Sequence, residues 1–160
     1  MPSVANFQAL ADECVRLGSY GKAIELYKSA LAGMHETEPG AMLGLAMAEF
    51  RKGDANAAGA TLDRLFAANP EFSSTEADLL AARILEAKGL LPEALGAYER
   101  LSAKYPGEEA KGRMALLLQR TGAEQRARAI FAEIRISVER SPAFYRRAQR
   151  EWYEIARRHA

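Results

Sequence analysis

The sequence predicts an all-α protein, a solenoid of four helical hairpins followed by one capping helix. Three observations predict this fold. Glycine recurs at Gly18, Gly53, Gly89 and Gly122, at intervals of 35, 36 and 33 residues. Apolar residues return at helical spacing before each of these glycines. No segment shows the alternation of apolar and polar residues that is typical of strands.

Small and large residues keep a fixed distance from each glycine. Five residues after each glycine stands an alanine, and four residues further on stands a large side chain. The alanines are Ala23, Ala58, Ala94 and Ala127, and the large residues are Tyr27, Leu62, Tyr98 and Phe131. Glycine lets the chain leave a helix through a left-handed conformation, and alanine permits two helices to approach closely. The pattern therefore predicts one hairpin around each glycine.

The predicted hairpins cover residues 4–37, 39–72, 75–107 and 108–140, and the capping helix covers 142–159, within a single domain over residues 1–160. Pro39 comes late after the first hairpin, which predicts a looser loop there. Ser73 and Glu76 are expected to form a capping box at the start of the third hairpin. Pro142 also comes late, so the last hairpin should have a longer second helix.

The capping helix is predicted to be amphipathic. Ser141 is expected to cap it, with Pro142 at its first position. Its apolar residues are expected to cover the end of the solenoid, while its arginines face water. The apolar set is Phe144, Tyr145, Ala148, Trp152 and Ile155, and the basic set is Arg146, Arg147, Arg150, Arg157 and Arg158.

A helix-turn-helix unit of about 34 residues with Gly, Ala, Tyr or Phe, and Pro at these offsets resembles the tetratricopeptide repeat. The resemblance implies a right-handed superhelix in which the first helix of each hairpin lines a concave groove. Residues 43–46, 105–111 and 145–152 are similar to a family of uncharacterised bacterial proteins with divergent repeats of this type. Some of its members carry an N-terminal membrane anchor. This resemblance therefore implies either a cytoplasmic protein or the cytoplasmic domain of a protein anchored in the inner membrane.

Composition excludes several classes of function. The 160 residues include 22 basic and 21 acidic side chains, so the net charge of +1 gives no field that would favour nucleic acid. Residues 108–160 are more basic than the rest, with 12 basic and 7 acidic side chains. A single cysteine, Cys14, excludes an internal disulfide and fits the cytoplasm. No apolar stretch reaches the length of a membrane span, so we expect no direct insertion by this chain.

No set of residues predicts catalysis, a cofactor or a metal site. Cys14 lies on the apolar stripe of its helix and is expected to be a buried core thiol. His35 and His159 are expected at the surface. The neighbouring carboxylates are expected to cap helices or to face solvent; these are Asp12 with Glu13 and Glu108 with Glu109. Phosphate-binding loops are absent from the sequence. The sequence therefore predicts that the protein is not an enzyme.

The resemblance implies which residues line the groove. The candidate set has an apolar middle and a basic end, which suits a protein segment with an apolar anchor and an acidic flank. The alternative for the apolar members of this set is that they pack between neighbouring repeats instead of contacting a partner. The set is Asp12, Arg16, Leu43, Met47, Phe50, Arg51, Leu79, Arg83, Glu86, Arg113, Leu116, Gln119, Arg120, Arg146 and Arg150.

Two functions follow from this reading. The first is a non-catalytic scaffold or adaptor that binds a protein segment in the groove. The alternative is self-association as a homo-oligomer, through edge hairpins and the helix that carries Trp152 and Tyr153. Chaperone tails are not expected as partners. The positions of the two-carboxylate clamp hold Gln8, Asp12, Gly44, Glu76 and Leu80, and the two acids among them would repel a peptide carboxylate.

Overall fold

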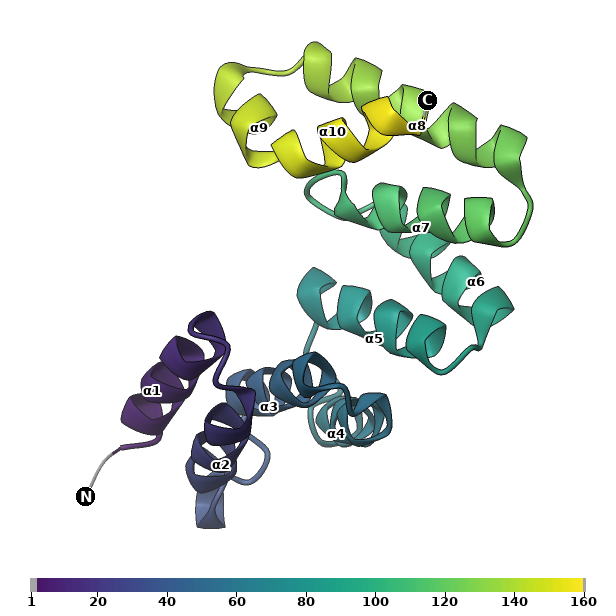
Figure 1. Cartoon of the computed structure of the whole chain (residues 1–160). Coiled ribbons are helices and arrows are strands. Elements are labelled where there is room, and N and C mark those ends of the chain that lie inside the picture. Colours follow the sequence, from purple (N-terminus) through teal and green to yellow (C-terminus); the bar gives the residue numbers. More distant parts are fainter. Residues whose placement is uncertain (1–2, 160) are drawn as a thin grey trace. The chain divides into compact units, whose positions relative to one another are not determined.

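The computed structural model describes residues 3–159, which form ten α-helices, one 3-10 turn and no strand (Figure 1). The predicted all-α helical repeat is therefore confirmed. The chain forms two compact units, an N-terminal unit that ends at Gly89 and a C-terminal unit that begins at Leu90. This division falls in the turn of the third predicted hairpin. The single domain and its four repeat boundaries stay predictions.

The N-terminal unit contains five α-helices among its described residues. These are α1 (Val4–Arg16), α2 (Tyr20–Ala30), α3 (Pro39–Lys52), α4 (Ala55–Ala68) and α5 (Thr75–Ala87). Helices α1 and α2 form one hairpin, α3 and α4 form the next, and α3 also packs against α1, α2 and α5. The loop between α2 and α3 contains the 3-10 turn, Gly33–His35, and Pro39 is the first residue of α3.

The C-terminal unit contains the other five α-helices of the described residues. These are α6 (Leu91–Ser102), α7 (Glu109–Arg120), α8 (Glu124–Glu139), α9 (Ala143–Ala148) and α10 (Arg150–Arg158). Helix α7 packs against α6 and α8, and α10 packs against α8 and α7. At 16 residues α8 is longer than α2, α4 and α6, as the late Pro142 predicts.

The hairpin turns and the core follow the repeat pattern. The four turn glycines have φ between 76° and 100°, the left-handed region that favours glycine. The four alanines after them are at most 1% exposed, and the four large residues at most 3%. The sequence pattern therefore identified the four turn glycines and the buried small and large residues that follow them.

Both predicted caps are wrong by one residue. Ser74, not Ser73, caps α5, because its hydroxyl accepts a hydrogen bond from the backbone N of Ala77 at 3.2 Å. Pro142 is itself the N-cap of α9, and the Ser141 hydroxyl donates to the carbonyl oxygen of Ser137 at 2.7 Å. A Ser or Thr next to a helix start identifies a helix boundary better than it identifies the cap itself.

The predicted capping helix is broken at Gln149 into α9 and α10. The side-chain oxygen of Gln149 accepts a hydrogen bond from the backbone N of Glu108 at 2.9 Å, which fixes this residue at the break. The apolar stripe does not continue across it. Trp152 is buried and Ile155 is half-buried, but Phe144 is 68% exposed and Ala148 is exposed. The expectation that Phe144 and Ala148 cover the end of the solenoid is therefore wrong.

Candidate functional site

The first helices of the N-terminal hairpins line a shallow hollow. Its volume is about 230 Å³, and it lies where α1, α3 and the start of α5 come together. The hollow includes three of the predicted groove residues, Asp12, Leu43 and Met47. The complete lining is Asp12, Val15, Tyr27, Gly40, Leu43, Gly44, Met47 and Glu76.

Tyr27 forms the floor of this hollow. Its hydroxyl donates a hydrogen bond to Oδ1 of Asp12, and the side chain is 2% exposed. The ring lies directly against α3 at Gly44, where a Cβ atom would stand 2.4 Å from Cε1 of the ring. Burial, together with the hydrogen bond to Asp12, raises the pKa of Tyr27 above its usual range. Tyr27 therefore stays a neutral donor that fixes the Asp12 carboxylate at the edge of the hollow.

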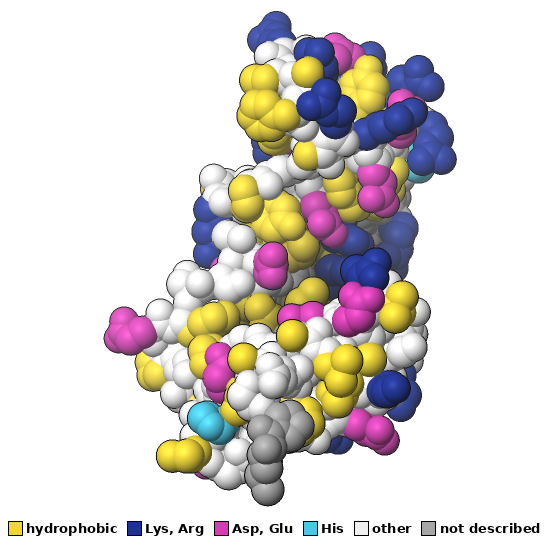
Figure 2. All heavy atoms as spheres, turned by 90° about the vertical axis from the view of Figure 1, so that its left-hand side faces the viewer, with side chains coloured by type: hydrophobic (Ala, Val, Ile, Leu, Met, Phe, Trp, Pro, Cys, Tyr) yellow, Lys and Arg dark blue, Asp and Glu magenta, His cyan; other side chains and the backbone are white. Residues whose placement is uncertain are grey.

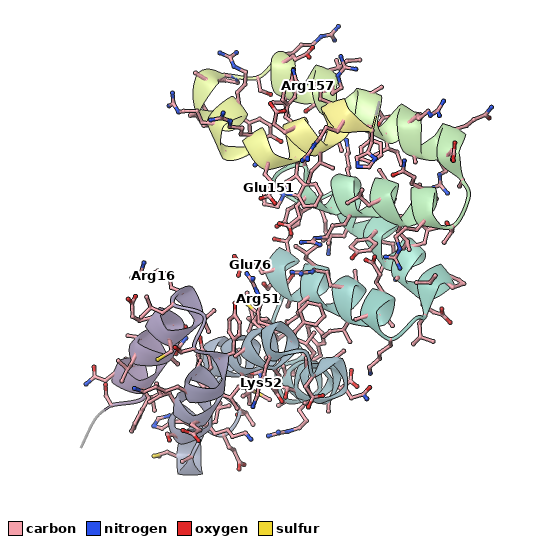
Figure 3. All side chains as sticks on the ribbon, in the orientation of Figure 1. Arg16, Arg51, Lys52, Glu76, Glu151 and Arg157 are labelled. Carbon is pink, nitrogen blue, oxygen red and sulfur yellow. The ribbon has the colours of Figure 1, made fainter. Side chains whose placement is uncertain are left out.

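The hollow is apolar in its walls and acidic at its edge. Leu43 and Met47 are half-buried on α3, and Val15 faces them from α1. Asp12 and Glu76 are exposed, and no Lys or Arg is among the lining residues. Figure 3 shows Glu76 at the start of α5, with its side chain directed toward α1. The hollow therefore suits an apolar group with a positive charge beside it.

Other predicted groove residues of the N-terminal unit contact one another or their own helix. The Arg83 guanidinium lies over the Phe50 ring at 4.8 Å, which joins α5 to α3. Nε of Arg16 lies 2.8 Å from the Glu13 carboxylate. Leu79 is 7% exposed, which leaves little of its side chain for a partner. Arg51 is exposed, and Glu86 is half-buried.

The predicted groove residues of the C-terminal unit form a second group. Arg113 pairs with Glu109 at 2.8 Å and lies over the Trp152 ring at 5.3 Å. Arg146 donates to the carbonyl oxygen of Ser141 at 2.9 Å. Both arginines therefore already have contacts within the C-terminal unit. The remaining members are Leu116 and Gln119, which are half-buried, and Arg120 and Arg150, which are exposed.

Glu108 is a buried polar residue that the sequence reasoning missed. It is 3% exposed, and its Oε1 accepts hydrogen bonds from the hydroxyls of Ser137 at 2.7 Å and Tyr145 at 2.9 Å. The carboxylate thus joins the start of α7 to α8 and α9, and the expected solvent role is wrong. The partners are 29 and 37 residues away in the chain, so no local sequence signal identifies them.

The Tyr145 hydroxyl gives this cluster a measurable pH dependence. Burial and the hydrogen bond to Glu108 raise the pKa of Tyr145 from 10.0 to about 12. A raised pKa in the folded state means that this stabilisation is complete below pH 10 and is lost as the pH rises toward 12. We expect the unfolding free energy of the wild type to fall more steeply over this interval than that of Tyr145→Phe. Urea unfolding at a series of pH values measures this, and parallel profiles would contradict it.

Cysteine and histidine show no reactive arrangement among the described residues. Cys14 is 7% exposed in the core of the first hairpin, as predicted. His159, expected in solvent, stacks on Phe131 with ring centroids 5.3 Å apart, so its assignment to the solvated surface is wrong. Within residues 3–159, His, Cys, Asp and Glu form no group of three that could hold a metal ion. None of the described helices is long and apolar enough to cross a bilayer.

Stacked hairpins with left-handed glycine turns define a helical repeat protein. The tetratricopeptide repeat family matches residues 15–74 and again residues 76–107, which together are more than half of the sequence. The chain therefore belongs to the tetratricopeptide repeat family. Repeats of this family are typically non-catalytic and mediate contacts between proteins. No curated protein matches the sequence.

Solved structures of repeat proteins share this fold. A putative kinesin light chain from Podosopora anserina is 18% identical, with a TM-score of 0.71 over 99% of this chain and 96% of that one. TTC0263 from Thermus thermophilus is 19% identical, with a TM-score of 0.70 over 98% and 79%. YrrB, a TPR protein described as having an unusual peptide-binding site, is 16% identical, with a TM-score of 0.66 over 83% and 68%. At these identities the likeness shows the fold alone.

Proposed function

We propose that this protein is a non-catalytic scaffold that binds a segment of a partner protein on the inner faces of α1, α3 and α5. The observation that carries the proposal is the hollow in which Leu43 and Met47 are half-buried beside Asp12. Its volume of about 230 Å³ is below the roughly 300–1,000 Å³ of small-molecule sites. The hollow is therefore suited to a single large side chain of a protein segment rather than to a metabolite.

The chemistry of the hollow supports a protein ligand. Methionine adapts its shape to varied apolar side chains, which favours Met47 as the contact for an apolar anchor. A peptide-binding site is also described for YrrB, which shares the fold.

We propose the cytoplasm as the location of the protein. Its single cysteine, Cys14, lies in the core of the first hairpin, and a reducing compartment keeps such a thiol free. Self-association through Trp152 receives no support from the geometry, because this side chain is 9% exposed and packs on α7 of its own copy. Any contact between copies therefore needs another surface.

The proposal is tested with the variant Met47→Glu. We expect this variant to lose binding to a partner that the wild type captures from a lysate of its native cells and that is then purified. A glutamate in the apolar hollow must be desolvated when an apolar side chain of the partner enters. Isothermal titration calorimetry measures the binding, and circular dichroism checks that the helices remain.

The matched control is Met34→Glu, which makes the same substitution outside the hollow. Met34 is 92% exposed. We expect this control to bind as the wild type does. Equal affinity of both variants for the partner would sink the assignment of the binding surface to α1, α3 and α5.

A further inference from the structure

We propose that the hollow of the N-terminal unit receives α9 of a second copy of the chain. In this contact Phe144 of one copy enters between Leu43 and Met47 of the other, and Arg147 pairs with Asp12 and Glu76. The inference rests on the proposed function, because it names an occupant of the same hollow. It is based on two surfaces of the same chain, the hollow and α9, whose charges and shapes are complementary.

No Lys or Arg is among the residues that line the hollow. Among the described residues, Glu76 has no hydrogen bond and no ion pair, and Asp12 uses only Oδ1, for Tyr27. Both carboxylates are exposed beside apolar walls, so a cation can reach them while an apolar group enters the hollow. An occupant that brings an apolar group and a cation together satisfies both parts of the hollow.

Helix α9 presents this combination on its surface. Phe144 is 68% exposed, and a large exposed aromatic side chain beside charged residues is typical of an interaction surface. Arg147 stands three residues later on the same helical face and is also exposed. Figure 2 shows Lys and Arg side chains beside apolar ones on the surface of the C-terminal unit.

The two units also carry opposite net charges. The N-terminal unit, residues 1–89, has 8 basic and 12 acidic side chains, whereas residues 90–160 have 14 basic and 9 acidic ones. Attraction between such surfaces speeds the encounter of two copies and orients them head to tail. A head-to-tail contact that does not close into a ring leaves one hollow and one α9 unused at the ends of the assembly, so it produces oligomers that grow with concentration.

The inference is tested by sedimentation velocity on the full chain, from micromolar concentration upward and at low and high salt. We expect the weight-average mass of the wild type to rise above that of the monomer with concentration and to fall when salt screens the charges. Met47→Glu blocks the hollow, and Phe144→Glu blocks the helix that enters it. Each variant alone should remain a monomer.

The decisive sample is a mixture of the two variants in equal amounts. In this mixture α9 of the Met47→Glu variant can enter the hollow of the Phe144→Glu variant, while the other hollow and the other α9 are blocked. We therefore expect a heterodimer and nothing larger. The controls are Met34→Glu and Ile136→Glu, because Met34 and Ile136 are exposed apolar residues outside the proposed contact. They should associate as the wild type does. If Met47→Glu loses helical structure, Glu76→Lys replaces it, since Glu76 is exposed.

Two results would overturn the inference. One is a wild type that stays monomeric at all concentrations in low salt, and the other is association that survives both Met47→Glu and Phe144→Glu. A monomer that still binds a purified heterologous partner, and loses that binding through Met47→Glu, removes this inference and leaves the proposed function standing. A wild type that neither associates with itself nor binds a partner protein removes both the inference and the proposed function.

Discussion

Replacing Gly112 by alanine is expected to destabilise the protein by about 2–3 kcal/mol, the upper part of the range for overpacked cores. Alanine in a helix interior normally stabilises relative to glycine. Here the new Cβ would stand 2.2 Å from Cε3 of Trp152 and 2.7 Å from Cζ3. The indole is rigid, 9% exposed and covered on one face by Arg113. Helix α10 must therefore move away from α7 to admit one methyl group.

Gly96→Ala is the matched control for this prediction. Gly96 lies inside α6 of the same unit, and the only atom near its added Cβ is Nη1 of Arg100, at 3.4 Å. We expect this change to stabilise the protein by up to about 1 kcal/mol. Urea unfolding followed by circular dichroism gives both values, and the emission of Trp152, the single tryptophan, reports whether α10 stays docked. Similar unfolding free energies for the two variants would show that α10 shifts without strain.

Gly44→Ala is expected to destabilise the N-terminal unit by about 2 kcal/mol, for the same physical reason. Its Cβ would stand 2.4 Å from both Cε1 and Cζ of Tyr27. This ring cannot turn aside easily, because it is 2% exposed and its hydroxyl is bonded to Asp12. Gly59→Ala in α4 is the control, since its Cβ meets the mobile end of Lys88 at 3.0 Å and should have little effect.

A double-mutant cycle tests the assigned cause for Gly44. Tyr27→Leu removes the ring but keeps a large apolar residue, and Leu62 occupies the equivalent place in the second hairpin. In the Tyr27→Leu background, Gly44→Ala should lose most of its destabilising effect in urea unfolding. Additive effects of the two substitutions would mean that the ring is not what Gly44 accommodates.

Local sequence signals predicted the turn glycines and the buried residues after them, because each such set lies within one period of the repeat. The turn at Gly53 needs a left-handed residue, and Ala58 and Leu62 pack that hairpin five and nine positions later. Helical spacing also predicted that the thiol of Cys14 is buried. Such features depend on helical spacing, which a single sequence displays directly.

The C-terminal end could not be predicted in the same way. A continuous helix over residues 142–159 satisfies the amphipathic pattern, but Gln149 instead binds the backbone at Glu108, which lies 41 residues away. Burial of the Glu108 carboxylate depends on Ser137 and Tyr145, which also approach it only through folding. Contacts between distant helices therefore decided where the helix broke and which face of α9 became exposed.

The candidate site was predicted only in part, for a related reason. The resemblance to the tetratricopeptide repeat implied that Asp12, Leu43 and Met47 line the groove, and the structure brings these three into one hollow. The resemblance could not show that Arg83 stacks on Phe50 or that Leu79 becomes buried, because both depend on neighbouring helices. Glu76 was considered only as a clamp position, yet its carboxylate lines the hollow.

The positions of Cys14 and Trp152 give each unit its own natural reporter. Cys14, the only thiol, is buried in the hairpin of α1 and α2, and Trp152, the only indole, is buried where α10 covers α7. A thiol reagent modifies Cys14 only when the first hairpin opens, whereas tryptophan emission changes only when α10 leaves its place. The unlabelled chain thus allows opening at its two ends to be timed separately, which distinguishes stepwise fraying of a repeat array from all-or-none unfolding.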